Sequence, residues 1–253
     1  MRIEKDRWLS DVLGVSSWKV LGVAATMPPA EIKLGLLDRA GRGAAFFFAK
    51  IPTRDVAAVT NATRAGFSVV DVNVTFDWKD MAKDESGSGV CGDGNLITET
   101  ASLDDATAIE AIAGHCFVFS RFHFDPAIGL ERANEVKRQW ARNACRGRAS
   151  AVYVARQHDT VTGFLAVLES KSGAGTDAII DLVGIDAGHQ GQGAGRALSR
   201  MFVDQWRGRA DRLRVGTQIS NIPAMRLYES IGFRAAETAY VLHAHVKNGA
   251  LAA

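Results

Sequence analysis

The stretch Gln190-Gly191-Gln192-Gly193-Ala194-Gly195 determines how the rest of the chain is interpreted. It follows residues 178–185 (AIIDLVGI), an apolar run typical of a buried central strand, and precedes the apolar spacing of an amphipathic helix. Glycines in such a turn let backbone N–H groups converge, and the helix contributes free N–H groups and the positive end of its dipole. The combination predicts a site for a phosphate or pyrophosphate group.

Two common phosphate-binding motifs do not fit this stretch. A Walker loop ends in Gly-Lys-Ser/Thr, whereas this loop continues as Gly195-Arg196-Ala197. A dinucleotide fingerprint needs a third glycine where this chain has Arg196. What remains is the pattern Q-x-x-G-x-G, met by Gln190, Gly193 and Gly195, or a glycine-rich turn that binds no ligand.

A second pattern begins 31 residues after Gln190 and reads Asn221-x-x-Ala224-x-x-x-Tyr228-x-x-x-Gly232-Phe233. Its spacing places Asn221, Ala224 and Tyr228 on one helix face, with Asn221 able to cap the helix. Taken alone, Tyr228 also fits an ordinary core tyrosine. In their order and distance, however, the two patterns together resemble the signatures of the GNAT superfamily of N-acetyltransferases.

This resemblance implies an α/β (α+β) fold with a mixed, splayed central sheet, and acetyl-CoA as cosubstrate. Tyr228 would protonate the departing thiolate, because a tyrosine hydroxyl with a pKa of about 10 is protonated at neutral pH. A backbone N–H group near Ile185 would stabilise the oxyanion. The implied catalytic residues are Tyr228 and Asn221, and the implied cofactor-binding residues are Ile185, Gln190, Gly191, Gln192, Gly193, Ala194, Gly195, Arg196, Asn221 and Ala224.

The sequence leaves the general base open. An attacking amine must lose a proton, and Asp181, Glu99 and Asp186 are candidates for receiving it, directly or through water. Each of the three also fits an ordinary polar residue with no catalytic role.

Residues 83–95 (KDESGSGVCGDGN) are rich in glycine, serine and charge, which is typical of a linker or long loop. They divide the chain into a smaller N-terminal lobe, residues 1–90, and a catalytic domain, residues 91–253. The first lobe is expected to hold a strand at 44–51, a helix capped by Thr53 and a strand at 67–76. We expect this strand–helix–strand unit to be a partial GNAT-like lobe.

One internal echo connects the two lobes. Residues 63–67 (TRAGF) and residues 229–233 (ESIGF) each end a helix and begin a strand. The echo indicates either that the first lobe is a reduced copy of the C-terminal half of the second, or only that this punctuation is common.

In the second domain, Ser102 and Asp105 form a predicted capping pair for a helix that reaches Cys116. A second helix is expected from Leu130 to Ala144 and is closed by Gly147. A hairpin is predicted around residues 158–162, and further strands at 213–217 and 233–243.

Several strings across the whole chain resemble the branch of GNAT enzymes that acetylates nucleotide-linked amino sugars, TDP-fucosamine acetyltransferases among them. Ser120-Arg121-Phe122 lies where this family builds its acceptor pocket. The resemblance implies that Arg121 meets a phosphate of the acceptor, with His123 and Thr217 as further substrate-binding candidates. A loop whose arginine faces water is the alternative.

Composition excludes other classes. The chain has 253 residues, with 30 Lys and Arg against 28 Asp and Glu, and no basic run interleaved with aromatics indicates nucleic acid. Cys91, Cys116 and Cys145 lack zinc-ligand spacing and fit a reducing cytoplasm. His243 and His245 have no carboxylate at a typical ligand spacing, so we interpret them as tail residues and expect no metal.

Neither a secretory signal nor a membrane span is expected, so the sequence predicts a cytoplasmic protein. The family resemblance is compatible with a homodimer. Alternative functions are acetylation of a peptide or a small free amine, or non-catalytic sensing of acyl-CoA; a nicotinamide enzyme is more distant.

Overall fold

A computed structural model describes residues 1–79, 96–172 and 175–252, so the predicted 83–95 linker and Cys91 lie outside the described residues. In the first part of the chain the elements are β1 (Arg2–Lys5), α1 (Arg7–Leu13), β2 (Ser16–Leu21), α2 (Pro29–Ala40), β3 (Ala45–Pro52), α3 (Val56–Arg64) and β4 (Ser68–Trp78). The following elements are β5 (Leu96–Thr100), α4 (Ala106–Ala113), α5 (Leu130–Asn143), β6 (Ala151–Gln157), β7 (Thr160–Ser172), β8 (Gly175–Ile185), α6 (Ala194–Trp206), β9 (Arg212–Gln218), α7 (Ile222–Ser230), β10 (Phe233–Lys247) and β11 (Ala250–Leu251).

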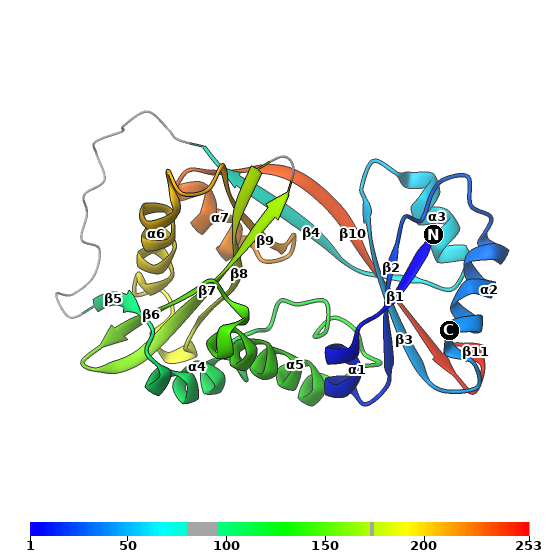
Figure 1. Ribbon diagram of the computed structural model, residues 1–253, viewed down its shortest axis with the longest axis horizontal. Coiled ribbons are helices and arrows are strands. Elements are labelled where there is room, and N and C mark those ends of the chain that lie inside the picture. The colour runs from blue at the N-terminus through cyan, green and yellow to red at the C-terminus, as the bar shows by residue number, and fades with distance from the viewer. Residues whose placement is uncertain (80–95, 173–174, 253) are drawn as a thin grey trace.

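The strands of the described residues form one mixed sheet in the order β1-β2-β3-β10-β4-β9-β8-β7-β6-β5, with β11 paired to β10 (Figure 1). The fold is therefore the expected α/β class with a mixed sheet. β10, from the predicted catalytic domain, lies between β3 and β4 of the predicted N-terminal lobe. The two lobes consequently share one sheet and are not joined by a linker alone.

The strand order contains an exchange between two similar units. One unit is β2-α2-β3-α3-β4 and the other is β8-α6-β9-α7-β10, and in each the first two strands are parallel. The third strand of each unit then inserts beside the other unit: β4 pairs with β9, and β10 pairs with β3. The predicted echo between the lobes corresponds to the helix-to-strand turns before β4 and β10.

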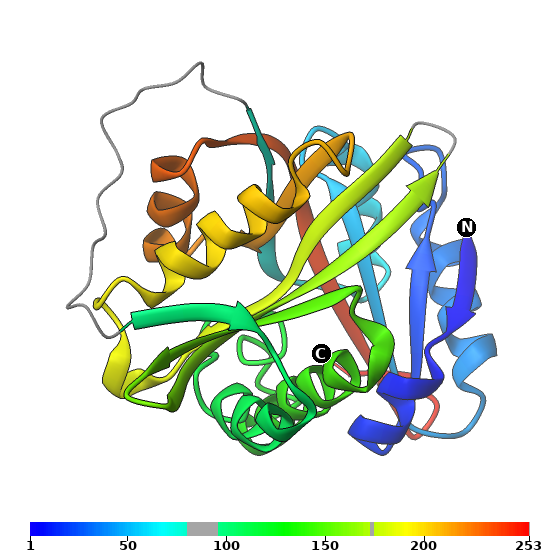
Figure 2. The same ribbon diagram turned by 60° about the vertical axis from the view of Figure 1, so that its left-hand side comes forward.

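Helices cover both faces of the sheet. Figure 2 shows α6 and α7 on one side of strands β6 to β8, and α4 and α5 on the other. On the first side Phe76, Phe202 and Phe233 are fully buried in one core. On the second side α1 packs with α5, and Leu9, Phe122 and Val136 share a core with Phe46 of β3. The face of the sheet that carries α1 and α5 therefore extends across both units.

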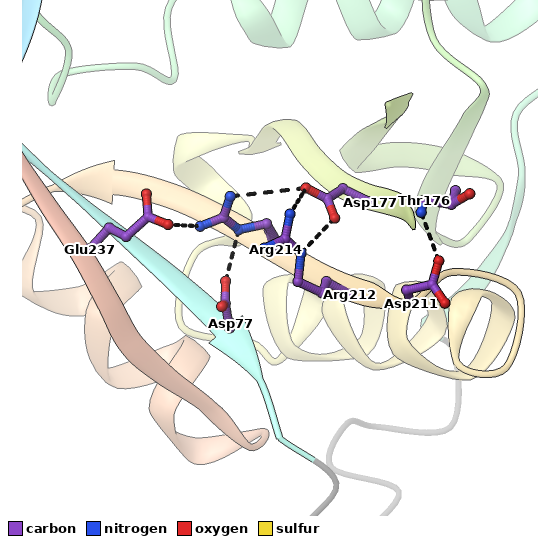
Figure 3. Close-up of polar contacts among 7 residues, drawn as sticks. All are labelled: Asp77, Thr176, Asp177, Asp211, Arg212, Arg214 and Glu237. Carbon is purple, nitrogen blue, oxygen red and sulfur yellow. Dashed lines mark hydrogen bonds and ion pairs between the residues drawn. The ribbon is translucent and has the colours of Figure 1, made fainter. Parts of the chain in front are cut away.

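The parallel pair β8–β9 is held firmly at one end. Its register joins Asp177–Ile180 to Arg212–Val215. At this end Arg212 donates two hydrogen bonds to Asp177, of 2.7 and 2.8 Å (Figure 3). Arg214 donates to Asp77 of β4 at 2.8 Å and to Glu237 of β10 at 2.7 Å. The arginines thus tie four strands together where the pairing is complete.

The same pair opens at its other end. After Ile180 the register between β8 and β9 stops, although β8 continues to Ile185 and β9 to Gln218. The register of β8 with β7 shifts at this point, leaving Asp181 as an extra residue between Ile180 and Leu182. A bulge of this kind bends a strand away from its neighbour. The expected splay of the central sheet is therefore present, and it begins at Asp181.

Several local predictions are corrected in detail. Asp55, not Thr53, precedes the first turn of α3, and the Thr53 hydroxyl instead hydrogen-bonds Thr238 of β10. The helix after Ser102 ends at Ala113, before Cys116, although the Ser102–Asp105 capping box is present. α5 ends at Asn143, and a π-turn carries the chain to Gly147. The described residues include no helix with the length and apolarity that crossing a membrane requires.

Candidate active site

A cavity of about 1190 Å³ lies at the splayed end of β8 and β9. Its walls include Ala194 and Tyr228 from the side of α6 and α7, and Lys50 and Arg121 from the side of α1 and α5. Because residues from both faces of the sheet line one cavity, the gap between β8 and β9 connects the two faces. The volume is sufficient for a small-molecule ligand.

The glycine loop forms one end of this cavity. Gly191 has a φ of 76° and Gly193, the residue that caps α6, has a φ of 92°, so both occupy the left-handed region that favours glycine. The Gln190 side chain donates to the Ile185 carbonyl at 3.2 Å, which fixes the loop to the end of β8. The N–H groups of the first turn of α6 have no partner within the helix. The local geometry suits an anion.

Most of the predicted cofactor-binding residues meet in this cavity. The lining includes Ile185, Gln190, Gly191, Gly193, Ala194, Gly195, Arg196, Asn221 and Ala224. Gln192 is the exception, because its side chain turns back to donate to the Gly188 carbonyl at 3.1 Å and does not line the cavity.

The second signature forms α7 as predicted. The Asn221 side-chain oxygen accepts a hydrogen bond from the Ala224 N–H at 3.3 Å, which caps the helix. Tyr228 lines the cavity but is only 3% exposed, and its ring packs against Phe76 and Phe233. Burial raises the pKa of Tyr228 above its usual value. The hydroxyl therefore stays protonated at neutral pH, as a proton donor must.

Of the three base candidates, only Asp181 lines the cavity. Its carboxylate accepts from Trp140 at 2.7 Å and from Arg148 at 2.5 Å, so it is firmly held. Asp186 instead pairs with His115 and His189, and Glu99 pairs with Arg156, both away from the cavity lining.

A fourth carboxylate, Asp71 of β4, also lines the cavity and was not among the predicted residues. Its Oδ1 accepts from the Val72 N–H at 2.7 Å, while its buried Oδ2 has no hydrogen-bond partner among the described residues. Burial raises the pKa of Asp71 to about 6, against the opposing effects of the Val72 N–H group, the Lys50 charge and the nearby Gln218 side chain. A base with such a pKa can accept a proton near neutral pH.

The wall on the α1 and α5 side is predominantly cationic. Lys137 is 8% exposed, and its ammonium lies 4.6 Å from the Phe117 ring centre and 5.0 Å from that of Trp140. Burial and the charge of Arg121 lower the pKa of Lys137 to about 8. The basic residues that line the whole cavity are Lys19, Lys50, Arg121, Lys137, Arg196, Arg214 and Arg226, against the acidic residues Asp71 and Asp181.

Two of the three predicted substrate-binding residues line the cavity, and the third does not. Arg121 and Thr217 line the cavity, and Thr217 is buried on β9 with its carbonyl accepting from Asn73 at 3.0 Å. His123 does not line it, because its two ring nitrogens contact Ser120 at 2.6 Å and Asn134 at 2.9 Å. His123 therefore holds the loop in shape, and a direct contact with substrate is not supported.

The interpretation of His243 and His245 as tail residues is wrong. Both lie on β10 in the interior, where Asp125 Oδ2 is 2.6 Å from His243 Nδ1 and 2.8 Å from His245 Nε2. Asp125 is 118 residues from His243 in sequence, so local spacing could not reveal the pair. His243 Nε2 in turn lies 3.2 Å from Arg121 Nη1.

Known proteins resemble this chain at two levels. Residues 116–233 match the sequence model of the acetyltransferase (GNAT) family. A curated relative, spore coat polysaccharide biosynthesis protein SpsD of Bacillus subtilis (strain 168), is 33% identical over 140 residues, 55% of this chain. The match covers 47% of that protein, so the chain spans about half the length of the curated relative it matches.

Solved structures extend the similarity of fold to the N-terminal lobe. A GCN5-related N-acetyltransferase from Sphaerobacter thermophilus has a TM-score of 0.59 at 12% identity, covering 97% of this chain and 76% of that one. Another from Kribbella flavida has a TM-score of 0.57 at 14% identity, covering 90% and 80%. These coverages include most of the first 90 residues. The sequence match to the acetyltransferase (GNAT) family therefore covers residues 116–233, and the similarity of fold to GCN5-related N-acetyltransferases extends over most of the chain.

Proposed function

We propose that the protein transfers an acetyl group from acetyl-CoA to a primary amine, and that the acceptor is a nucleotide-linked amino sugar. The observation that carries the proposal is the single cavity that connects the glycine loop, the buried Tyr228 hydroxyl and a cationic chamber across the open strand pair. Acetyl-CoA would supply the acyl group as a thioester.

The residues fit such a cosubstrate. The N–H groups at the start of α6 and the left-handed Gly191 and Gly193 suit its pyrophosphate. The edge of β8 from Asp181 to Ile185, which pairs with β7 but no longer with β9, suits its extended arm. Asn221 would contribute its amide nitrogen, because its oxygen already caps α7. We propose that Tyr228 donates the proton to the departing thiolate.

The proton of the attacking amine needs a destination. Asp71 fits this role better than Asp181, because its Oδ2 is buried without a partner whereas Asp181 already accepts two hydrogen bonds. An unpaired buried carboxylate in a cationic chamber also attracts the amino group of an acceptor. After one turnover Asp71 holds the proton taken from the amine, and Tyr228 has given its proton to the thiolate. Exchange of protons with solvent then returns both residues to their starting states.

The charge of the chamber supports the acceptor class. Lysine and arginine side chains are the groups that bind phosphates, and Arg121 can do so with two N–H groups. The name of the Bacillus relative concerns polysaccharide biosynthesis, which agrees with a sugar acceptor. A basic peptide would meet like charge on this wall, which disfavours it. A small free amine and a non-catalytic acyl-CoA sensor are the alternatives.

Thiol release from acetyl-CoA tests the proposal. We expect release with 4-amino-4,6-dideoxy or 3-amino-3,6-dideoxy sugars linked to a nucleoside diphosphate, and at least tenfold less with the same sugars lacking the nucleotide. Equal rates with free amines would reject the nucleotide-linked acceptor. If the protein binds acetyl-CoA but none of the amines tested causes thiol release, the non-catalytic sensor would be favoured.

Three broader proposals accompany this one. Residues 1–90 are a partial GNAT-like lobe and residues 91–253 a catalytic GNAT domain; the protein acts in the cytoplasm; and it forms a homodimer. The exchange of β4 and β10 supports the first, because it relates the two halves by one pattern of strand pairing. Light scattering of the purified protein tests the third.

A further inference from the structure

Arg121 is held in an unusual setting within the cavity wall. Its guanidinium carbon lies 4.1 Å from the ring centre of Phe48 and 4.2 Å from that of Phe122. Among the described residues no carboxylate lies within ion-pair distance of it. Burial lowers the pKa of Arg121 to about 10, so the side chain still carries its charge at neutral pH. It is a half-buried cation without an ion pair among the described residues, although the more distant carboxylates of Asp6 and Asp125 favour its charged form.

The hydrogen bonds behind Arg121 have only one consistent direction. An arginine can only donate, so His243 Nε2 accepts from Arg121 Nη1 and the His243 proton resides on Nδ1. That Nδ1–H group donates to Asp125 Oδ2 at 2.6 Å, and Asp125 Oδ1 accepts from the Ala127 N–H at 2.9 Å. Burial lowers the pKa of His243 to about 4, which agrees with the neutral ring that this direction requires.

Packing leaves this chain of groups little freedom. The His243 side chain is 1% exposed, and the Phe46 ring meets it edge-on with centres 4.7 Å apart. His245 shares the Asp125 oxygen at 2.8 Å, whereas the hydrogen bond with Arg121 is made by His243. The Asp125–His243 pair and the rings of Phe48 and Phe122 therefore constrain the guanidinium in different directions.

We propose that the Asp125–His243 pair is a positioning device for Arg121, which it aims so that the remaining N–H groups bind a phosphate of the acceptor. The proposal rests on the proposed function for the identity of the acceptor. Asp125 and His243 are positioning residues in this account, because only Arg121 faces the cavity. A fork held in advance binds a phosphate with less loss of side-chain entropy.

Asp125, His243 and His245 could also be considered as ligands of a metal ion. The ligand atoms of Asp125, His243 and His245 lie within 4.8 Å of one another. Their nitrogen–oxygen distances of 2.6 and 2.8 Å are those of hydrogen bonds, and the Arg121 charge lies against the free nitrogen of His243. A proton therefore explains the cluster better than a metal cation.

His243→Asn breaks the hydrogen bond to Arg121 and keeps the hydrogen bond to Asp125. The asparagine amide can replace Nδ1 toward Asp125 but cannot reach Arg121. His245→Gln is the matched control, since it keeps a donor to Asp125 and never touched Arg121. The readout that needs no acceptor is the side-chain Nε–H NMR signal of Arg121, assigned by its loss in Arg121→Lys. We expect slow hydrogen exchange in the wild type and His245→Gln, and exchange at least tenfold faster in His243→Asn.

Binding of UDP, dTDP and inorganic pyrophosphate, measured by calorimetry, tests the consequence. A lost hydrogen bond to a charged group weakens binding about tenfold, which we expect for His243→Asn, and the KM for the acceptor should rise similarly while kcat changes little. Arg121→Lys combined with His243→Asn should be no weaker than the weaker single variant. The affinity for acetyl-CoA should be the same in the wild type and in these variants. Because it is measured separately, a failure to bind acetyl-CoA would count against the proposed function and not against the positioning of Arg121.

Three outcomes would overturn the proposal: equal effects of His243→Asn and His245→Gln, additive effects of Arg121→Lys and His243→Asn, or a wild type that binds none of the three anions. If His243→Asn does not fold, Asp125→Asn serves instead, because it keeps the size of the side chain and removes its charge. In that variant we expect anion binding weakened about threefold; unchanged binding would also overturn the proposal.

Discussion

The units β2-α2-β3-α3-β4 and β8-α6-β9-α7-β10 share their order of elements and exchange their third strands, yet only the second contains the glycine loop. Their closing turns are nearly the same, since Gly66 has a φ of 107° and Gly232 a φ of 100°. Counted back from these glycines, Asp55 and Asn221 both precede the first helical turn. Over this last helix and its closing turn, residues 55–66 and 221–232, the two units therefore correspond residue by residue.

The differences lie where a ligand would bind. Where the second unit has Tyr228, the same count in the first gives Ala62, which is fully buried. The loop after β2 begins with Gly22 at a φ of 66°. The Asn61 side-chain amide of α3 then donates to the backbone carbonyls of Ala25 and Met27 in this loop. Pro29 begins the following helix and has no N–H group to offer. The comparison teaches that a few side chains, rather than the fold, separate a ligand site from its structural copy.

The largest expected effect is that of Tyr228→Phe, which removes from the second unit the hydroxyl group that Ala62 of the first unit also lacks. If the hydroxyl donates a proton, kcat should fall about 100-fold while acetyl-CoA affinity stays the same. Steady-state kinetics and calorimetry measure the two. Tyr240→Phe, on β10 away from the cavity lining, is the control and should leave both unchanged. An unchanged kcat in Tyr228→Phe would remove the tyrosine from the chemistry.

Gly191→Ala and Gly22→Ala form the next pair, because each glycine follows the first strand of its unit. Their φ values are 76° and 66°, and an added Cβ meets nothing within 4 Å at either. Both variants should lose about 1 kcal/mol of stability from the left-handed backbone. Only Gly191→Ala should weaken acetyl-CoA binding, about tenfold, since only that loop aims N–H groups at the ligand. Similar binding losses in both would erase the distinction between the units.

The smallest effect concerns two acidic residues, each five positions after the closing glycine of its unit. Asp71 is unpaired in the cavity, whereas Glu237 pairs with Arg214 at 2.7 Å. The folded-state pKa of Asp71, raised to about 6, makes its stabilising contribution complete below pH 4 and lost as the pH rises through 6. The full rise of about 2 in this pKa corresponds to roughly 3 kcal/mol, and screening in the open cavity reduces it. Asp71→Asn should therefore gain about 1 kcal/mol of unfolding free energy at pH 8 and nothing at pH 4.

Urea unfolding at the two pH values measures this gain. Glu237→Gln is the matched control and should change stability by less than about 0.5 kcal/mol, because the Glu237 side chain is 65% exposed and Arg214 keeps its hydrogen bond to Asp77. A gain at pH 4 equal to that at pH 8 would show that the Asp71 charge is not responsible.

Local signals in the sequence were sufficient for several elements, among them the loop and helix that line one end of the cavity. The glycine loop, the Asn221 cap, the Ser102–Asp105 capping box and the hairpin between β6 and β7 depend on neighbouring residues, and each is present in the structure. The acceptor side depends on pairings that span the chain. Asp71 lies in a polar row of β4 that alternation alone assigns to solvent, and β10 inserts beside β3 across nearly 190 residues, from Thr53 to Thr238.

The Asp125–His243–Arg121 arrangement was missed for the same reason, since its members come from the loop before α5 and from the last long strand. No local pattern marks a histidine on a strand as the partner of a distant aspartate. The helices and strands of the first 40 residues were also not predicted. Their apolar residues pack against β3 and α5, and that packing, rather than local propensity, defines them.

Calorimetric titration with acetyl-CoA, beside NAD and ATP, tests the central claim most directly. The account predicts micromolar binding of acetyl-CoA alone, retained in Gly22→Ala and weakened about tenfold in Gly191→Ala. Absence of acetyl-CoA binding, or equal binding of NAD or ATP, would contradict it, and the glycine loop would then be a second structural copy without a ligand.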